Sequence, residues 1–127
     1  MVYGEEKRKF PRAVFPCKVI IGSPVRLIVS HTENISEGGL RVMLEEKLGA
    51  YTNVGMEIFF EKERPLKCKG RIIWVVEKIN PLEKKAVMYD TGIQFIDMQE
   101  TDIQYIRNLV SALIVSDKES DDAGKDQ

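Results

Sequence analysis

The sequence predicts an all-β domain, an antiparallel barrel or sandwich, that is followed by a C-terminal helix. Two observations lead to this prediction. Between residues 13 and 97, about six short runs rich in Val, Ile, Phe and Tyr alternate with turn-forming residues. Beyond this region, apolar residues recur instead at three- and four-residue steps. Because the strands follow one another without intervening helices, we expect them to pair antiparallel.

The predicted strands are bounded by clear breakers. Glycine, proline and asparagine interrupt the apolar runs at 22–24, 49–55, 64–65 and 80–81, and a polar loop is expected at 33–39. The fifth run begins by alternating apolar or small residues with basic ones, which is typical of a half-buried strand. The six runs cover residues 14–21, 24–32, 39–44, 56–62, 66–79 and 86–97.

The helix is predicted over residues 100–115, and its apolar face should pack on the barrel or seal one end of it. Residues 116–127 lack apolar periodicity, so we expect a disordered acidic tail. With a flexible basic arm at residues 1–12, the chain divides into this arm, a domain of residues 13–115 and the tail. The apolar helix positions are Ile103, Ile106, Leu109, Val110, Leu113 and Ile114.

The composition indicates a cytoplasmic, single-domain protein. A length of 127 residues is enough for one core, and a net charge of −1 with a pI near 5.9 argues against duplex DNA as a partner. No run approaches the ~20 apolar residues that cross a bilayer, and the N-terminus lacks a signal-peptide core, so no membrane insertion is expected. Cys17 and Cys68 are too few for a zinc site or a disulfide scaffold, which favours free thiols.

The sequence does not indicate an enzyme. His31 is the only histidine, and it lies in a strand-like run without the neighbours that nucleophilic catalysis requires. The chain has no phosphate-binding glycine motif and no metal-spaced Cys/His cluster, so we expect neither a metal nor a cofactor. Adjacent carboxylates resemble solvated edges more than acid/base pairs.

A basic arm is the first candidate for binding chemistry. Arg8 and Arg12 stand four residues apart, preceded by Lys7 and separated by a segment that contains Phe10 and Pro11. Proline restricts the preceding residue to extended geometry, so the arginines are expected to project from an extended arm, anchored by the phenylalanine. The arginine fork bonds bidentately to phosphate or to a guanine edge, and its flat face stacks on bases.

The second candidate is the glycine-rich segment. Asn34 carries an amide that donates and accepts, and Ser36 carries a hydroxyl. Gly38 and Gly39 permit positive φ and a close approach of backbone to a ligand. Arg41 follows them, and the sequence leaves open whether it faces a ligand or solvent.

Together these segments resemble the PilZ domain, a bacterial receptor for cyclic di-GMP. That family carries Arg-x-x-x-Arg, about twenty residues, and then (Asp/Asn)-x-Ser-x-x-Gly. The segments "GRIIWVV" and "TGIQFIDM" and the terminal helix are also similar to the family, so the resemblance covers roughly residues 5–115. The matching residues are Arg8, Arg12, Asn34, Ser36 and Gly39.

The resemblance implies a PilZ-like six-stranded antiparallel β-barrel of the split-barrel type, with cyclic di-GMP on its outer surface. The arm would wrap the ligand, while Asn34, Ser36 and Gly39 would meet a guanine from the barrel. Asn34 stands where Asp is commoner, so an acceptor remains but a charge is lost. Lys7, just before the first arginine, occupies a position that influences whether one ligand or an intercalated pair is bound.

The resemblance also sets expectations about partners. They are cyclic di-GMP, an unidentified effector protein that reads the reordered arm, and a second copy in a ligand-linked dimer, all in the bacterial cytoplasm. The regulated process is not encoded in any motif of the chain.

Two other hypotheses compete. The first is a PilZ-like interaction module that docks on a partner without binding the nucleotide. The second is a small barrel that binds single-stranded nucleic acid, which requires exposed aromatics and a basic groove. The aromatic residues mostly lie in apolar runs, and Trp74 is expected in the core, so the second hypothesis has little support.

Overall fold

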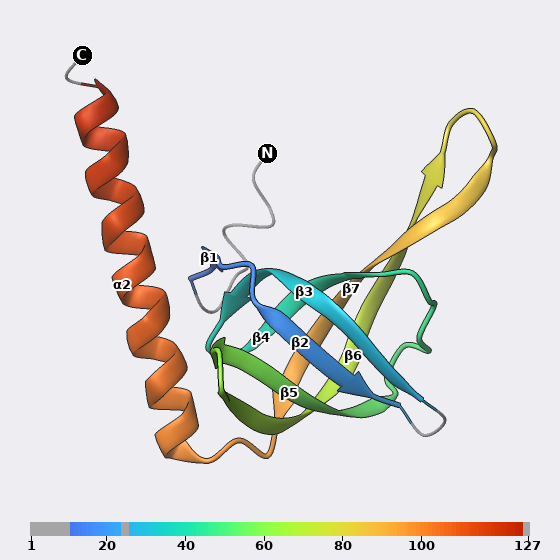
Figure 1. The fold of residues 1–127 in the computed structure, drawn as a ribbon, viewed down its shortest axis with the longest axis horizontal. Helices are drawn as coiled ribbons and strands as arrows, with labels where there is room; N and C mark the ends of the chain where they lie inside the picture. Colours follow the sequence, from blue (N-terminus) through green and yellow to red (C-terminus); the bar gives the residue numbers. More distant parts are fainter. Residues whose placement is uncertain (1–10, 24–25, 126–127) are drawn as a thin grey trace.

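The computed structural model describes residues 11–23 and 26–125 as seven strands and a long helix (Figure 1). Each of the six predicted runs overlaps at least one strand. The strands are β1 (Ala13–Val14), β2 (Lys18–Gly22), β3 (Leu27–Ser36), β4 (Gly39–Leu44), β5 (Asn53–Glu61), β6 (Arg64–Asn80) and β7 (Lys85–Ile96), followed by helix α2 (Glu100–Lys125).

Six of these strands close into an antiparallel barrel, which confirms the predicted fold class. The order around the barrel is β2, β5, β6, β7, β4 and β3, and pairing of β3 with both β4 and β2 closes it. The short β1 is an outer strand, paired with the far end of β3. A closed barrel leaves no free sheet edge around its middle, which is one way that antiparallel proteins avoid edge-to-edge association.

The first predicted run is divided in the structure. Residues 14–21 were expected to form one strand, but β1 ends at Val14 and β2 begins at Lys18. Pro16 lies in the gap, and because proline has no N–H to donate, it interrupts a ladder at this position. Both β1 and β2 remain paired with β3, so the interruption bends the N-terminal segment without releasing it.

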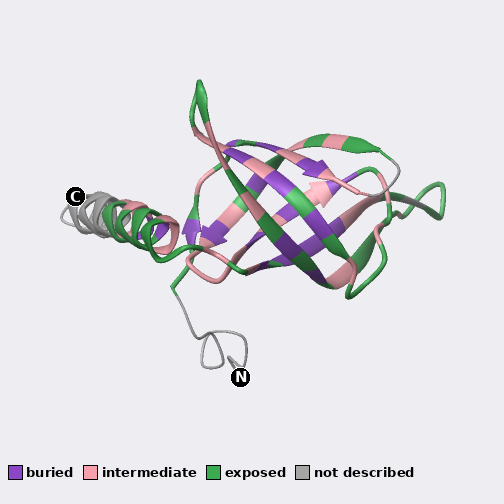
Figure 2. Ribbon diagram, turned by 90° about the horizontal axis from the view of Figure 1, so that it is seen from below, coloured by how far each residue is buried: buried purple, intermediate pink, exposed green. Residues whose placement is uncertain are grey.

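The core fills the barrel largely by alternation of side chains along the strands, visible as bands of buried and exposed residues in Figure 2. In β4, for example, Leu40, Val42 and Leu44 are buried, whereas the residues between them are partly exposed. Ile72 of β6 and Ile93 of β7 face each other in the same interior. Inward-facing aliphatic side chains supply most of the apolar area that folding removes from water.

Helix α2 packs on the barrel through the predicted apolar face. Ile106 and Val110 are buried, and the helix contacts β1 and β3 (Figure 1). The helix continues to Lys125, beyond residue 115 where the apolar periodicity ends. Once a helix is nucleated, each further residue adds a backbone hydrogen bond, so a docked helix can extend past its apolar face. Within the described residues, no helix is long and apolar enough to cross a bilayer.

Candidate functional site

The glycine-rich segment forms a strand end and a tight turn. The sequence predicted a loop at 33–39, but β3 continues to Ser36 and β4 starts at Gly39, so only Glu37 and Gly38 form the turn. The Ser36 hydroxyl accepts a hydrogen bond from the Gly38 N–H at 3.2 Å and donates one to the Gly39 carbonyl at 3.4 Å. The loop prediction was wrong because these polar residues pair with neighbouring strands on both sides.

A bulge turns the motif side chains outward. The register of β3 with β4 shifts between Thr32 and Asn34, after which Asn34 pairs with Arg41 and Ile35 pairs with Leu40. Ile35 and Leu40 are buried, so their neighbours along the strands face the outside of the barrel. Bulges commonly re-aim side chains in this way next to functional sites. Asn34 and Arg41 therefore lie side by side on the outer face.

Gly39 is required by a close approach between strands. The sequence permits positive φ at Gly38 and Gly39, but no glycine among the described residues has positive φ. Instead, a Cβ atom on Gly39 would lie 2.1 Å from the Ile93 carbonyl oxygen and 3.1 Å from the Gln94 Cα. Strand β7 therefore leaves no room for a side chain at Gly39.

The outer strand β1 places the start of the arm next to the glycine turn. Ala13 pairs with Ile35 and Val14 pairs with Asn34, so the chain before Ala13 begins beside Ser36 and the turn. Arg12 is exposed and directly precedes this pairing. Lys7 and Arg8, like Phe10, lie outside the described residues. Of the two predicted arginines, the structure therefore places Arg12 beside the glycine turn.

Thr32, which sequence reasoning missed, fixes the base of the arm. Its side chain is 1% exposed. The hydroxyl donates to the Phe15 carbonyl and accepts a hydrogen bond from the Cys17 N–H at 3.1 Å. These bonds span the break around Pro16 and hold β1 and β2 against β3. A polar residue in an inward position was the only sequence signal for this role.

Arg41 is held by Asp90 of β7. The Arg41 Nε lies 2.7 Å from Asp90 Oδ1, and its Nη2 lies 2.8 Å from Oδ2, a bidentate pair. Hydrogen bonding to this carboxylate raises the pKa of Arg41. Lys78 also approaches the carboxylate, at 3.9 Å. The pair fixes the direction of a cation next to Asn34 through its Nε and Nη2.

Trp74 lies on the outside of the barrel and not in the core, contrary to the sequence prediction. A register shift between Ile72 and Trp74 reverses the alternation, and Trp74 pairs with Gly92 of β7. A Cβ atom on Gly92 would lie 2.2 to 2.7 Å from atoms of the indole, so the ring covers this glycine. Gly92 also pairs with Arg41. One row across the outer face thus reads Asn34, Arg41, Gly92 and Trp74.

The next row adds polar groups. Ser36 pairs with Gly39, which pairs with Gln94, which pairs with Arg71 of β6. Gln94 and Arg71 are both exposed, and the Arg71 Nε donates to the Asn53 side-chain oxygen at 3.1 Å. We call the two rows together the motif face; its side chains are Asn34, Ser36, Arg41, Arg71, Trp74 and Gln94, with no side chain at Gly39 and with Gly92 buried beneath the Trp74 ring.

The turn is also bonded to helix α2. The Glu37 carboxylate accepts hydrogen bonds from the Arg107 Nε at 2.8 Å and from its Nη2 at 3.2 Å. This bonding lowers the pKa of Glu37. The Glu37 side chain is 15% exposed. The turn that carries the glycine motif is therefore attached to the helix as well as to the barrel.

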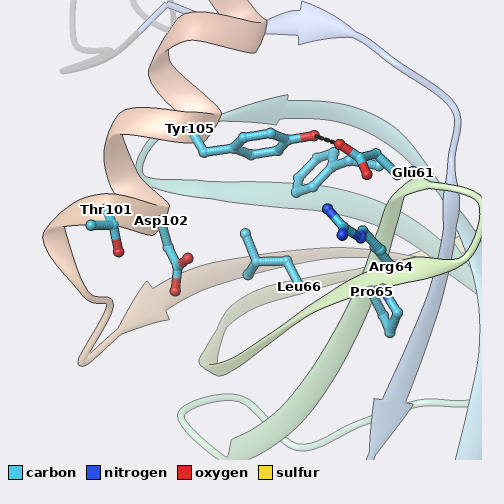
Figure 3. Close-up of a pocket in the computed structure, with 8 residues that line it drawn as sticks. Glu61, Arg64, Pro65, Leu66, Thr101, Asp102 and Tyr105 are labelled. Atoms are coloured by element: carbon cyan, nitrogen blue, oxygen red, sulfur yellow. Dashed lines mark hydrogen bonds between the residues drawn. The ribbon is translucent and has the colours of Figure 1, made fainter.

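A separate groove of about 330 Å³ lies between α2 and the β5–β6 hairpin (Figure 3). Phe60 and Leu66 are among its apolar lining residues, and the Tyr105 hydroxyl reaches the Glu61 carboxylate at 3.5 Å. Arg64 points into the groove in Figure 3. None of the motif-face residues lines this groove, so it is a second and independent surface feature.

No metal site is formed within residues 11–23 and 26–125, because no three His, Cys, Asp or Glu side chains in that part of the chain are grouped to bind an ion. Cys17 and Cys68 are free thiols there. The chemistry that the motif face offers is hydrogen bonding, cationic pairing and aromatic contact.

Comparison with known proteins gives a family and a fold. The family model of the PilZ domain matches residues 6–112. No curated protein sequence matches the chain. Among solved structures, the PilZ domain of Escherichia coli YcgR with c-di-GMP has a TM-score of 0.70 and 14% identity, covering 91% of this chain and 98% of that one.

Two longer proteins show the same fold. The Bacillus subtilis inhibitor of motility, MotI or DgrA, has a TM-score of 0.71 and 17% identity, covering 87% of this chain and 52% of that one. The MrkH–c-di-GMP complex of K. pneumonia has a TM-score of 0.69 and 16% identity, covering 90% and 54%. The chain therefore spans about half the length of these two proteins.

Proposed function

This chain belongs to the PilZ domain family, and from that premise we propose that it is a receptor for cyclic di-GMP. One observation carries the proposal. Strand β1 pairs with β3 at Asn34, so the arm that bears the arginines begins beside the turn that bears the asparagine, serine and glycine. Two of the structures with this fold, the YcgR PilZ domain and MrkH, are complexes with c-di-GMP.

In this proposal the arm and the motif face hold the ligand from two sides. Arg8 and Arg12 bond to guanine edges and phosphates with their forks, and a good bidentate guanine contact is worth roughly 1–3 kcal/mol of discrimination. Asn34 and Ser36 bond to a guanine from the barrel side. The absence of a side chain at Gly39 lets ligand and backbone approach closely.

Further groups on the motif face suit the same ligand. Arg41 is oriented by Asp90, and its guanidinium would bond to a phosphate through Nη1. The Trp74 indole offers a flat apolar surface on β6, across β7 from Arg41, where base–aromatic stacking contributes roughly 1–3 kcal/mol per base. Lys69 and Arg71 alternate along the exposed side of β6 and would attract a dianion.

Ligand binding would act by ordering the N-terminal arm and not by catalysing a reaction. We take the protein to be a cytoplasmic adaptor and not an enzyme, without a cofactor. Fixing the backbone of each arm residue costs roughly 1–2 kcal/mol, which the arginine contacts must offset. The ordered arm would present a new surface to an effector protein or to a second copy of the chain. Lys7 would favour a second bound ligand by balancing its charge.

The test is calorimetric titration of the purified protein with cyclic di-GMP, with GTP and cyclic mononucleotides as controls. We expect saturable heat with wild type and at least a tenfold loss of affinity, about 1.4 kcal/mol, in Arg8→Ala and in Arg12→Ala. Lys18→Ala is the matched control, because Lys18 is an exposed cation of β2 that contacts the Phe59 ring and not the motif face. Equal heats in all four proteins would remove the two arginines from the site.

The groove between α2 and the β5–β6 hairpin supports a second candidate, an interaction module that does not bind the nucleotide. Its mixture of apolar and polar lining residues is typical of a surface that holds a partner's side chain. This candidate becomes the better one if cyclic di-GMP gives no thermal shift with wild type. Leu66→Asp should then abolish co-purification of the partner, whereas Arg12→Ala should leave it unchanged.

A further inference from the structure

The Glu37–Arg107 ion pair differs from the other surface ion pairs in what it connects. Glu37 is the first residue of the two-residue turn, next to Ser36 and the motif glycines. Arg107 lies on α2, 70 residues along the chain, and it uses both Nε and Nη2 to bond the carboxylate. A fork of this kind fixes direction as well as distance, unlike a single ammonium contact.

The arginine is itself held in place. Its Nη1 donates to the Gln104 side-chain oxygen at 3.0 Å, one helical turn earlier. The neighbouring Ile106 is fully buried, and Val110 is buried one turn later. The helix position that presents Arg107 is therefore set by the core, and the carboxylate of the turn bonds to a fixed partner.

The same helix contacts the two strands that border the arm. Helix α2 packs on β1 and β3, and these strands pair with each other at Asn34 and Ile35. The helix thus touches the turn through Glu37 and the base of the arm through β1. A shift of the turn or of β1 would therefore change the contacts of α2.

We propose that Arg107 is a positioning residue for the ligand site, which acts through Glu37 to hold the 36–39 turn in its binding geometry. The inference rests on the proposed function and deepens it, because it assigns part of the binding apparatus to α2. Arg107 need not touch the ligand. It fixes the turn whose backbone and Ser36 hydroxyl meet the guanine.

A reciprocal effect follows from this coupling. If docking of α2 strengthens ligand binding, ligand binding must strengthen docking of α2 by the same factor. The helix would then report occupancy of the site to a partner. Couplings of this kind are typically 5- to 150-fold in affinity.

The decisive experiment measures affinity for cyclic di-GMP and amide hydrogen exchange in the 127-residue chain. Arg107→Ala should bind the ligand about fivefold or more weakly than wild type, and the Gly38 N–H should exchange faster in it without ligand. Arg107→Lys should restore only part of the affinity, because it keeps the charge but not the fork. The matched control is Arg26→Ala, which removes a 2.7 Å ion pair with Glu46.

The outcomes separate the two proposals. Wild type that fails to bind cyclic di-GMP overturns the proposed function, and the positioning role with it. Wild type that binds, with Arg107→Ala equal to Arg26→Ala in affinity and in Gly38 exchange, overturns the positioning role alone. Ligand-induced protection of α2 amides in wild type that is lost in Arg107→Ala supports the coupling.

Discussion

Gly39 lies so close to Ile93 that a Cβ atom added to it would sit 2.1 Å from the Ile93 carbonyl oxygen. The added Cβ would collide with the backbone of the paired strand β7, and neither β4 nor β7 can move without disturbing the barrel. The glycine of the motif is therefore needed for folding as well as for the approach of a ligand. Loss of binding in a Gly39 variant has to be separated from loss of the fold.

We expect Gly39→Ala to lower the free energy of unfolding by about 1–3 kcal/mol, the usual cost of overpacking. Gly55→Ala is the matched control, because a Cβ atom there meets nothing within 4 Å. That control should change stability by no more than about 1 kcal/mol. Urea denaturation followed by circular dichroism measures both. Equal midpoints for the two variants would contradict the packing argument.

The hydroxyl of Thr32 is expected to hold the base of the arm. Thr32→Val keeps the shape but leaves the Phe15 carbonyl and the Cys17 N–H without this partner, at a cost of about 1–3 kcal/mol. Thr32→Ser keeps the hydroxyl and should retain these bonds. We therefore expect faster amide exchange at Cys17 in the valine variant than in the serine variant. Similar protection in both would show that the bonds do not hold the segment.

The sequence predicted the barrel because apolar alternation and turn residues are local signals. Leu40, Val42 and Leu44 alternate as expected and fill the interior. The extension of β3 to Ser36 was not predicted, because polar residues such as Glu33 and Asn34 have low strand propensity. Pairing with both β1 and β4 outweighs that propensity.

The candidate site was only partly predictable for a related reason. The arginine motif and the glycine motif are each a short local pattern, so the sequence reveals them. The outward direction of Trp74, in contrast, depends on a bulge after Ile72, because one extra residue reverses the side chains that follow. The bond between Glu37 and Arg107 depends on where a distant helix docks. Such long-range contacts leave no local pattern.

The stability of the fold should fall in alkali through Cys68. Burial, followed by the Asp102 carboxylate, raises the pKa of this thiol to about 12. An unfolded thiol titrates near 8.5, so between roughly pH 9 and 12 the folded chain keeps a proton that the unfolded chain has lost. Stability then decreases as pH rises, by up to about 1.4 kcal/mol per pH unit, with no effect below pH 8.

Urea denaturation at pH 7 and pH 10 tests this expectation. Wild type should lose more stability between the two values than Cys68→Ala, which lacks the titrating group. Alkylation of Cys68 at pH 8, followed by peptide mass mapping, should be roughly a thousandfold slower in the native chain than in urea. Equal losses in the two proteins, together with rapid native alkylation, would show an accessible and ordinary thiol.

Trp74 should report ligand binding directly. It is the single tryptophan of the chain, so the intrinsic indole fluorescence comes from one place on the motif face. Because its ring covers Gly92 next to Arg41, a guanine held on this face is expected to stack on it and quench the emission. Trp74→Phe should bind cyclic di-GMP with nearly wild-type affinity, and Trp74→Ala roughly tenfold more weakly, since stacking is worth roughly 1–3 kcal/mol per base. Emission that is unchanged at saturating ligand, with Trp74→Ala binding as tightly as wild type, would place the base away from β6.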